Sequence, residues 1–165
     1  MHKCFYFICP TDCLVQTINS RFKHENYFYT SLGNSFVYDC KTLIYIKQII
    51  EKHGIREICF VLSVDNIIVL DAIGVQEFSD IKTLNNCYNE IIRQKEHSKV
   101  LFQRNNTQFL ILSYYLNKKI SELQLHLTDI LNIPIKIRGK IYDKNEDSFT
   151  NIYSNLICLQ KHHFN

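Results

Sequence analysis

Two apolar runs near the start of the chain have the pattern of buried strands. Residues 3–10, KCFYFICP, are apolar up to a proline, which predicts a strand that ends there. Residues 25–34, ENYFYTSLGN, are rich in aromatic side chains and end at the turn pair Gly33-Asn34. The first part of the chain therefore predicts two strands of a buried sheet.

An amphipathic helix and a further strand follow. In residues 39–53 the apolar side chains recur at helical spacing, with Asp39 placed as the N-cap and Gly54 as the C-terminal glycine. Residues 56–62 then form another short apolar run. A strand, a helix and a strand in succession predict a βαβ unit and hence a parallel sheet.

The second half of the chain adds helices and a hairpin. Residues 66–74 are apolar without a clear period and leave strand and core loop equally open, whereas 77–97 and 107–132 have helical spacing. Residues 133–143 begin with strict alternation, which indicates a half-buried strand at an edge of the sheet, and 148–154 return as a hairpin strand. The predicted fold class is α/β, in three layers: a mostly parallel central sheet flanked by helices, with a C-terminal edge strand or hairpin.

Composition narrows the class of protein. The chain has 165 residues, of which 46% are hydrophobic and 21% charged, and this predicts a single folded domain over 1–165. The net charge is only +3 and no basic run exceeds Lys118-Lys119, so we expect no nucleic-acid partner. The apolar start is too short to span a membrane and lacks the features of a signal peptide, so we expect no membrane association.

The cysteines indicate a reducing compartment. There are seven, an odd number, and several lie in apolar runs, among them Cys4, Cys9, Cys59 and Cys158. Buried free thiols are the ordinary state of such residues, so we expect a cytoplasmic protein without a disulfide framework. The pair His162-His163 near the C-terminus has the character of a solvated tail.

Four segments, taken in order, resemble the β-class carbonic anhydrases. They are ICPTDCLV (8–15), FYTSLGNSF (28–36), TLIYIKQIIEKHGIREICFVLSVDN (42–66) and IRGKIYDKNEDSFTNI (137–152). They correspond to that family's Cys-x-Asp-x-Arg motif, its strand ending in Gly-Asn, its helix and metal-bearing strand, and its terminal hairpin strand. The resemblance implies a β-carbonic-anhydrase-like fold.

The same resemblance shows that the zinc ligands are missing. The family binds zinc through a Cys of the first motif and a His-x-x-Cys at the end of the later strand. Alignment on Gly54 places Ser63 at the His and Asn66 at the second Cys. Zinc prefers imidazole nitrogen, thiolate or carboxylate, so neither residue is an ordinary ligand.

The first motif is altered as well. Two residues before Asp12 stands Pro10 instead of Cys, while Cys9 and Cys13 lie at other spacings. Two residues after Asp12 stands Leu14 instead of Arg, so the aspartate has lost the partner that the family motif would supply. We therefore expect no metal and no cofactor, with Cys9 and Cys13 as the weak alternatives for a metal site.

These observations predict a non-catalytic homologue of β-carbonic anhydrase that binds a small polar molecule or a protein partner. The resemblance also implies a homodimer. The remaining cleft at the strand ends would be polar and free of metal, and its expected lining residues are Asp12, Gly33, Asn34, Ser63, Asp65 and Asn66.

Two enzymatic alternatives stay open. One is a zinc lyase that uses substitute ligands from among Cys9, Asp12, Cys13, His24, Cys40 and Asp65. The other is a thiol enzyme with Cys13 as the nucleophile at a helix N-terminus, for which His24 or His53 would be the base.

Overall fold

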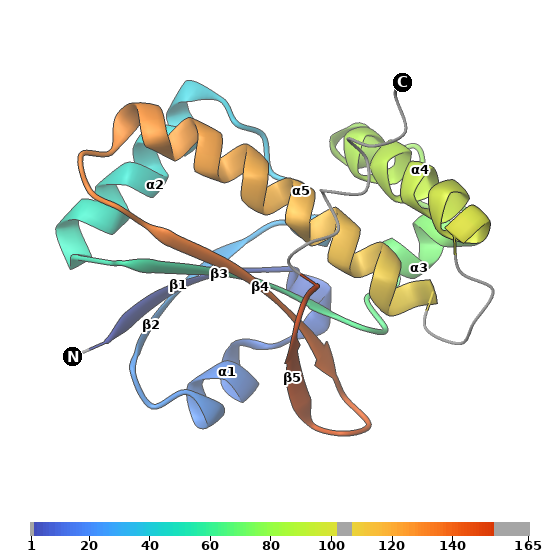
Figure 1. Ribbon diagram of the computed structural model, residues 1–165, viewed down its shortest axis with the longest axis horizontal. Coiled ribbons are helices and arrows are strands. Elements are labelled where there is room, and N and C mark those ends of the chain that lie inside the picture. Colours follow the sequence, from blue (N-terminus) through green and yellow to red (C-terminus); the bar gives the residue numbers. More distant parts are fainter. Residues whose placement is uncertain (1, 102–106, 154–165) are drawn as a thin grey trace.

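The computed structural model describes residues 2–101 and 107–153 (Figure 1). Strands and helices alternate as far as residue 73, and two further α-helices and a pair of strands follow. The strands are β1 (Lys3–Ile8), β2 (Glu25–Thr30), β3 (Glu57–Ser63), β4 (Lys136–Asp143) and β5 (Ser148–Asn151). The α-helices are α1 (Val15–Arg21), α2 (Cys40–His53), α3 (Ile67–Ile73), α4 (Asn85–Leu101) and α5 (Thr107–Ile130). Three short 3-10 helices are η1 (Pro10–Asp12), η2 (Leu32–Asn34) and η3 (Lys82–Leu84).

The strands form one sheet in the order β2-β1-β3-β4-β5. The first four strands are parallel to their neighbours and β5 pairs antiparallel with β4. This confirms the predicted mostly parallel α/β sheet with a C-terminal hairpin. The expectation that the strand within 133–143 lies at an edge is wrong, because β4 pairs with β3 on one side and β5 on the other.

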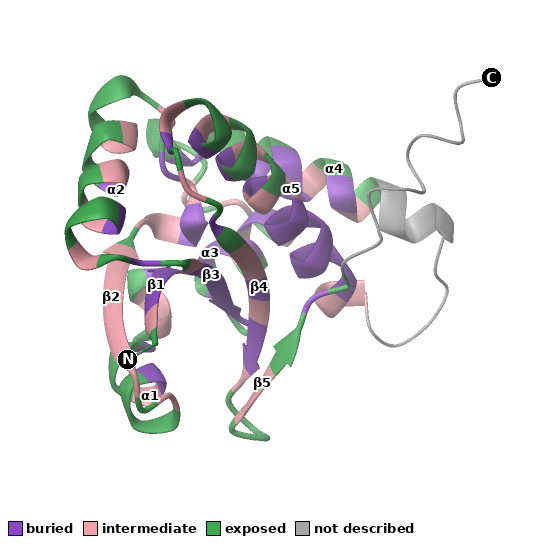
Figure 2. Ribbon diagram, turned by 60° about the vertical axis from the view of Figure 1, so that its left-hand side comes forward, coloured by how far each residue is buried: buried purple, intermediate pink, exposed green. Residues whose placement is uncertain are grey.

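Helices cover the two faces of the sheet unequally (Figure 1). On one face, α1 packs against Cys4, Tyr6 and Ile8 through Leu14 and Ile18. On the other face, α2 and α5 cover the alternate side chains of the same strands, in the largest of the buried clusters. The colouring by burial in Figure 2 shows the central strands enclosed between these layers. The alternation of side chains along each strand produces this three-layer arrangement.

Helix α2 begins and ends where the sequence predicts. The Asp39 carboxylate accepts a hydrogen bond of 2.7 Å from the backbone N–H of Thr42, which satisfies one of the free donors of the first turn. At the other end Gly54 has φ = 63°, a left-handed conformation that glycine adopts without the steric cost of a Cβ.

The segment 66–74 is neither of the two conformations that its pattern left open, a strand or a core loop, because residues 67–73 form helix α3. The helix is short, and Asn66 caps it by accepting a hydrogen bond of 3.0 Å from the backbone N–H of Val69. Side-chain capping therefore determines the conformation of a stretch in which periodicity was ambiguous.

The predicted helix over 77–97 begins later than expected, at Asn85. The Asp71 carboxylate accepts hydrogen bonds from the backbone N–H groups of Glu77, at 2.9 Å, and Phe78, at 3.0 Å. These bonds hold the start of the segment in a turn, because an aspartate side chain competes with helical hydrogen bonding for backbone donors.

The solvated tail predicted at His162-His163 and the buried thiol predicted at Cys158 lie outside the described residues. Within residues 2–101 and 107–153, no helix combines the length and the apolar character that crossing a bilayer requires.

Candidate functional site

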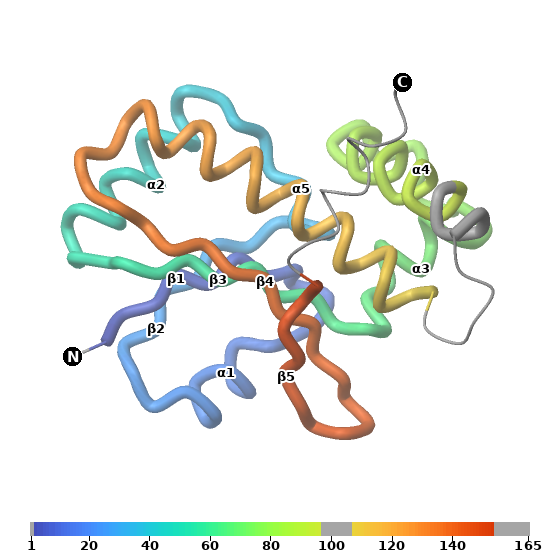
Figure 3. The backbone as a smooth tube through the Cα atoms, viewed as in Figure 1, coloured from blue at the N-terminus to red at the C-terminus, as the bar shows by residue number. Residues whose placement is uncertain are grey.

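Three polar segments meet at the end of the sheet where the parallel strands have their carboxyl ends. Helix η1 follows the end of β1, η2 follows β2, and residues 63–66 lie where β3 passes into α3. Because β2, β1 and β3 are adjacent and parallel, the chain leaves all three at the same edge (Figure 3). In open α/β sheets this carboxyl edge is where ligands bind.

Asp12 connects two of these segments. One oxygen of its carboxylate accepts a hydrogen bond of 2.8 Å from the backbone N–H of Ser63, and the other accepts one of 2.7 Å from the side-chain amide of Asn66. We call Asp12, Ser63 and Asn66 the Asp12 network. It joins the end of β1 to the turn between β3 and α3.

The environment of Asp12 changes its ionisation. Burial raises the pKa of its carboxyl to about 6, although the hydrogen bonds from Ser63 and Asn66 act in the opposite direction. The neighbouring charge of Asp65 adds to the increase. Leu14, which stands where the family motif has an arginine, is buried and apolar and offers no compensating charge.

Gly33 and Asn34 are buried and bonded to other parts of the chain. The backbone N–H of Gly33 donates to the Cys9 thiol at 3.1 Å, and its carbonyl accepts from the Tyr115 hydroxyl at 2.6 Å. The Asn34 amide donates to the carbonyl of Val61 at 3.1 Å. The carbonyl oxygen of the Asn34 side chain is buried without a hydrogen-bond partner among the described residues.

Most of the residues predicted to line the cleft are buried. Of its six predicted lining residues, Gly33, Asn34, Ser63 and Asn66 are buried, Asp12 is partly exposed and Asp65 is exposed. The structure brings three of the six into direct contact, in the Asp12 network, and holds η2 beside them through Cys9.

Two residues of this region were not predicted from the sequence. The Thr11 hydroxyl lies 2.9 Å from the Cys9 thiol and accepts a hydrogen bond of 3.4 Å from the Asn66 amide, so it links Cys9 to the Asp12 network. Tyr115 reaches Gly33 from α5 across 82 positions of sequence. No local pattern identifies a contact of that separation.

The donors at the strand ends do not fit a zinc site. Both Asp12 oxygens accept hydrogen bonds, Asn66 offers only an amide, and the Ser63 hydroxyl donates to the Tyr142 carbonyl at 3.5 Å. A zinc ion in a protein is bound by three or four side chains, which are thiolates, imidazoles or carboxylates. Among the residues that the structure describes, no three His, Cys, Asp or Glu side chains lie close enough to hold a metal ion.

Two of the substitute ligands considered from the sequence bond to other groups. The His24 ring bonds to the Tyr6 hydroxyl at 3.3 Å, and the Cys13 thiol donates to the carbonyl of Pro10 at 3.7 Å. Cys40 is exposed at the first turn of α2. The structure does not assemble these side chains with Cys9 and Asp12 into one site.

Fold and site together define an α/β protein whose strand ends carry a carboxylate–amide network. No protein-family model and no curated protein matches the sequence. Solved structures do match, and among them are several β-carbonic anhydrases.

One of these β-carbonic anhydrase structures comes from a study of two tetrameric enzymes of Sordaria macrospora. It has a TM-score of 0.71 and 12% sequence identity, and the match covers 92% of this chain and 80% of the Sordaria chain. The enzyme CafD of Aspergillus fumigatus has a TM-score of 0.70 and 15% identity, over 93% and 90% of the two chains. The Coccomyxa enzyme, in complex with acetazolamide, has a TM-score of 0.66 and 8% identity, over 92% and 72%. The chain therefore has a β-carbonic-anhydrase-like fold, as the resemblance implied.

Proposed function

We propose that this chain is a non-catalytic protein with the β-carbonic anhydrase fold, which binds a small polar molecule or a protein partner. One observation carries the proposal. Ser63 and Asn66, which occupy the positions where the resemblance implies zinc ligands, both donate hydrogen bonds to the Asp12 carboxylate. A hydrogen-bond network of the protein itself thus replaces the metal centre.

The chemistry of the donors supports this proposal. A zinc-dependent hydratase needs a metal-bound water whose pKa is lowered to near neutrality. The Ser63 N–H and the Asn66 NH₂ are hydrogen-bond donors, and the Asn66 amide oxygen already accepts from Val69, so neither position supplies a zinc ligand for activating water.

The exposed side of this region favours a neutral or cationic polar ligand. Asp12 is partly exposed and Asp65 is exposed beside it, so the accessible groups are acidic. Two carboxylates at one edge disfavour an anion by like-charge repulsion. The small polar molecule that we propose for this edge therefore carries no negative charge.

We also propose that the protein forms a homodimer. The support comes from the similar solved structures, of which those of Sordaria macrospora are described as tetrameric. The apolar first half of α5 does not add to this support, because its residues Leu110 to Leu116 are buried within the chain itself. Sedimentation velocity over a range of concentrations tests the assembly, and a monomer at all concentrations contradicts it.

The absence of zinc-dependent catalysis is tested on protein purified without added metal. We expect no stoichiometric zinc by elemental analysis, no saturable heat on titration with zinc chloride, and carbon dioxide hydration at the uncatalysed rate. The Cys40→Ser variant is the control for the loss of any one thiol, because Cys40 is exposed at the first turn of α2 and is not part of the Asp12 network. One equivalent of zinc that is retained by Cys40→Ser and lost in Cys9→Ser overturns the proposal, and so does hydration above background.

A further inference from the structure

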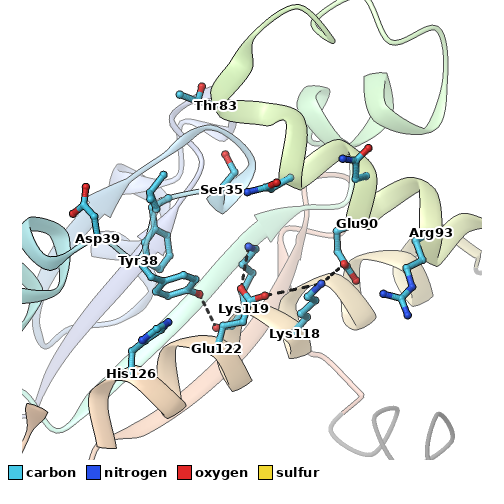
Figure 4. Close-up of a pocket in the computed structure, with 14 residues that line it drawn as sticks. Ser35, Tyr38, Asp39, Thr83, Glu90, Arg93, Lys118, Lys119, Glu122 and His126 are labelled. Atoms are coloured by element: carbon cyan, nitrogen blue, oxygen red, sulfur yellow. Dashed lines mark hydrogen bonds and ion pairs between the residues drawn. The ribbon is translucent and has the colours of Figure 1, made fainter. Parts of the chain in front are cut away.

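A pocket outside the Asp12 network lies between the loop that precedes α2 and the helices α4 and α5 (Figure 4). Its volume is ≈ 790 Å³, which is within the range of sites for drug-sized ligands and cofactors. We call it the α4–α5 pocket.

Polar side chains at helical spacing line two of its walls. Helix α4 contributes four of them within about two turns, and α5 contributes a second set along one face: Asn86, Asn89, Glu90, Arg93, Lys118, Lys119, Glu122 and His126. Helices that pack only to bury a core present apolar stripes to each other. Facing polar stripes around an open volume are typical of a binding site.

Charged groups are buried in these walls. Glu90 and Lys119 are each only 8% exposed. The Lys118 ammonium donates to the Glu90 carboxylate, and the Lys119 ammonium lies 3.2 Å from the Glu122 carboxylate. Buried charges are costly and are seldom present without a partner or a function.

One end of the pocket is aromatic. The rings of Tyr38 and His126 are stacked, with centroids 4.7 Å apart and an interplanar angle of 26°. The Lys119 ammonium lies 5.9 Å from the centre of the Tyr38 ring. Because the Tyr38 and His126 rings already stack on each other and Phe36 packs edge-on against Tyr38, a planar ligand ring at this end stacks on the side of His126 that faces away from Tyr38.

The other end has excess positive charge. Arg93 and Lys118 contribute two cations there against the Glu90 carboxylate. The Glu122 carboxylate, which pairs with Lys119, lies 4.0 Å from the Lys118 ammonium. The ion pairs of the described residues give each lysine a carboxylate partner and give Arg93 none. The third carboxylate on the lining, that of Asp39, already caps α2, so the exposed Arg93 guanidinium remains available to an anion.

The helix geometry sets the distance between these two ends. Lys118 and His126 are eight residues apart on α5, which at about 1.5 Å per residue corresponds to roughly 12 Å along the axis. Figure 4 shows Arg93 and Glu90 toward one end of the pocket and Tyr38 with His126 toward the other.

We propose that the α4–α5 pocket binds a nucleoside monophosphate or a similar elongated aromatic phosphate. The ring stacks beside Tyr38 and His126, and the phosphate is bound by the guanidinium of Arg93 and the ammonium of Lys118, both strong phosphate donors. The carboxylate of Glu122 lies between the two ends and accepts hydrogen bonds from hydroxyl groups of the ligand. This inference does not depend on the proposed function, because it uses none of the Asp12 network.

Three probes test the proposal by isothermal titration calorimetry on the full chain: AMP, adenosine and inorganic phosphate. We expect AMP to bind at least about tenfold more tightly than either fragment, because it makes both sets of contacts. Equal affinity for AMP and inorganic phosphate, equal affinity for AMP and adenosine, or no saturable binding of AMP at millimolar concentration each overturns the proposal.

Variants locate the site. Arg93→Gln should weaken AMP by roughly tenfold and leave adenosine unchanged, since a charge-assisted pair to phosphate is lost. The matched control is Arg56→Gln, which removes an exposed arginine that does not line the pocket. Equal losses in Arg93→Gln and Arg56→Gln contradict the assignment. If Arg93→Gln does not fold, the comparison of the three probes on the unaltered chain decides the question.

Discussion

The side-chain amide of Asn66 donates a hydrogen bond of 2.7 Å to the carboxylate of Asp12, across 54 positions of sequence. The carbonyl oxygen of the same side chain accepts the backbone N–H of Val69 and so caps α3. A single residue thus joins the end of β1 to the start of α3, at the position where the resemblance implies a metal-binding cysteine.

Substitution of Asn66 should therefore destabilise the protein strongly. We expect Asn66→Ala to lower the free energy of unfolding by about 2 to 3 kcal/mol, because it removes a helix cap and a partner of a buried carboxylate together. Urea unfolding measures the change. Asp65→Ala is the control, since Asp65 is exposed in the same turn, and equal effects of the two substitutions contradict a special role for Asn66.

The ionisation of Asp12 should make stability depend on pH. Its pKa is about 6 in the folded chain against 3.8 for the ordinary group, so the folded state binds the proton more tightly than the unfolded state. The contribution of the proton to stability is then fully present below about pH 4 and is lost as the pH rises through about 6.

The comparison with Asp12→Asn isolates this effect, because the amide does not titrate. We expect the unaltered chain to lose up to about 3 kcal/mol relative to Asp12→Asn between pH 4 and pH 7. Urea unfolding at intervals of pH measures the difference, and an NMR titration of the Asp12 carboxyl gives its midpoint. A stability difference that stays constant over this range contradicts the raised pKa.

Gly33 should tolerate no side chain. Its φ is 57°, and a Cβ at this position would lie 3.0 Å from a methyl carbon of Ile68 and 3.1 Å from the Cys87 thiol. We expect Gly33→Ala to lower the free energy of unfolding by about 2 kcal/mol, from backbone strain and overpacking combined.

Gly54 provides the matched control for that substitution. Its φ is 63°, similar to that of Gly33, but a Cβ there meets no atom within 4 Å. Gly54→Ala should therefore cost only the backbone strain, about 1 kcal/mol. Equal losses at the two glycines, measured by thermal unfolding, would show that the space around Gly33 does not matter.

The hydroxyl of Tyr115 should contribute to the position of η2. It is fully buried and donates to the carbonyl of Gly33 at 2.6 Å. We expect Tyr115→Phe to cost about 1 to 2 kcal/mol in urea unfolding, because it leaves a buried carbonyl without its donor. Tyr45→Phe, at a side chain that is 49% exposed, should change stability by less than about 0.5 kcal/mol.

Thiol labelling distinguishes a catalytic cysteine from ordinary ones. Cys13 and Cys40 are exposed, whereas burial raises the pKa of Cys4 to about 12 and that of Cys87 to about 11. We expect Cys13 and Cys40 to react with iodoacetamide at similar rates and well before the buried thiols, as peptide mapping by mass spectrometry would show. Labelling of Cys13 many times faster than Cys40 would instead support the thiol-enzyme alternative.

Much of the fold was predictable because it depends on local patterns. Helix α2 follows from its apolar spacing together with Asp39 and Gly54, and the structure confirms both ends. The helix expected over 77–97 failed at its start because the carboxylate of Asp71, outside that segment, binds the backbone of Glu77 and Phe78. Periodicity reports which side chains are apolar and does not report which distant carboxylate binds a backbone donor.

The sequence by itself determined the strands, helices α2 and α5, the polar turn after β3 and the lack of zinc-binding residue types at Ser63 and Asn66, since these depend only on the identity and spacing of neighbouring residues. Only the tertiary structure decided that Asp12 bonds to both of those positions and that the cations of α4 and α5 share one pocket. Such contacts join residues that lie far apart in sequence, and they form only when the sheet and the packed helices bring them together.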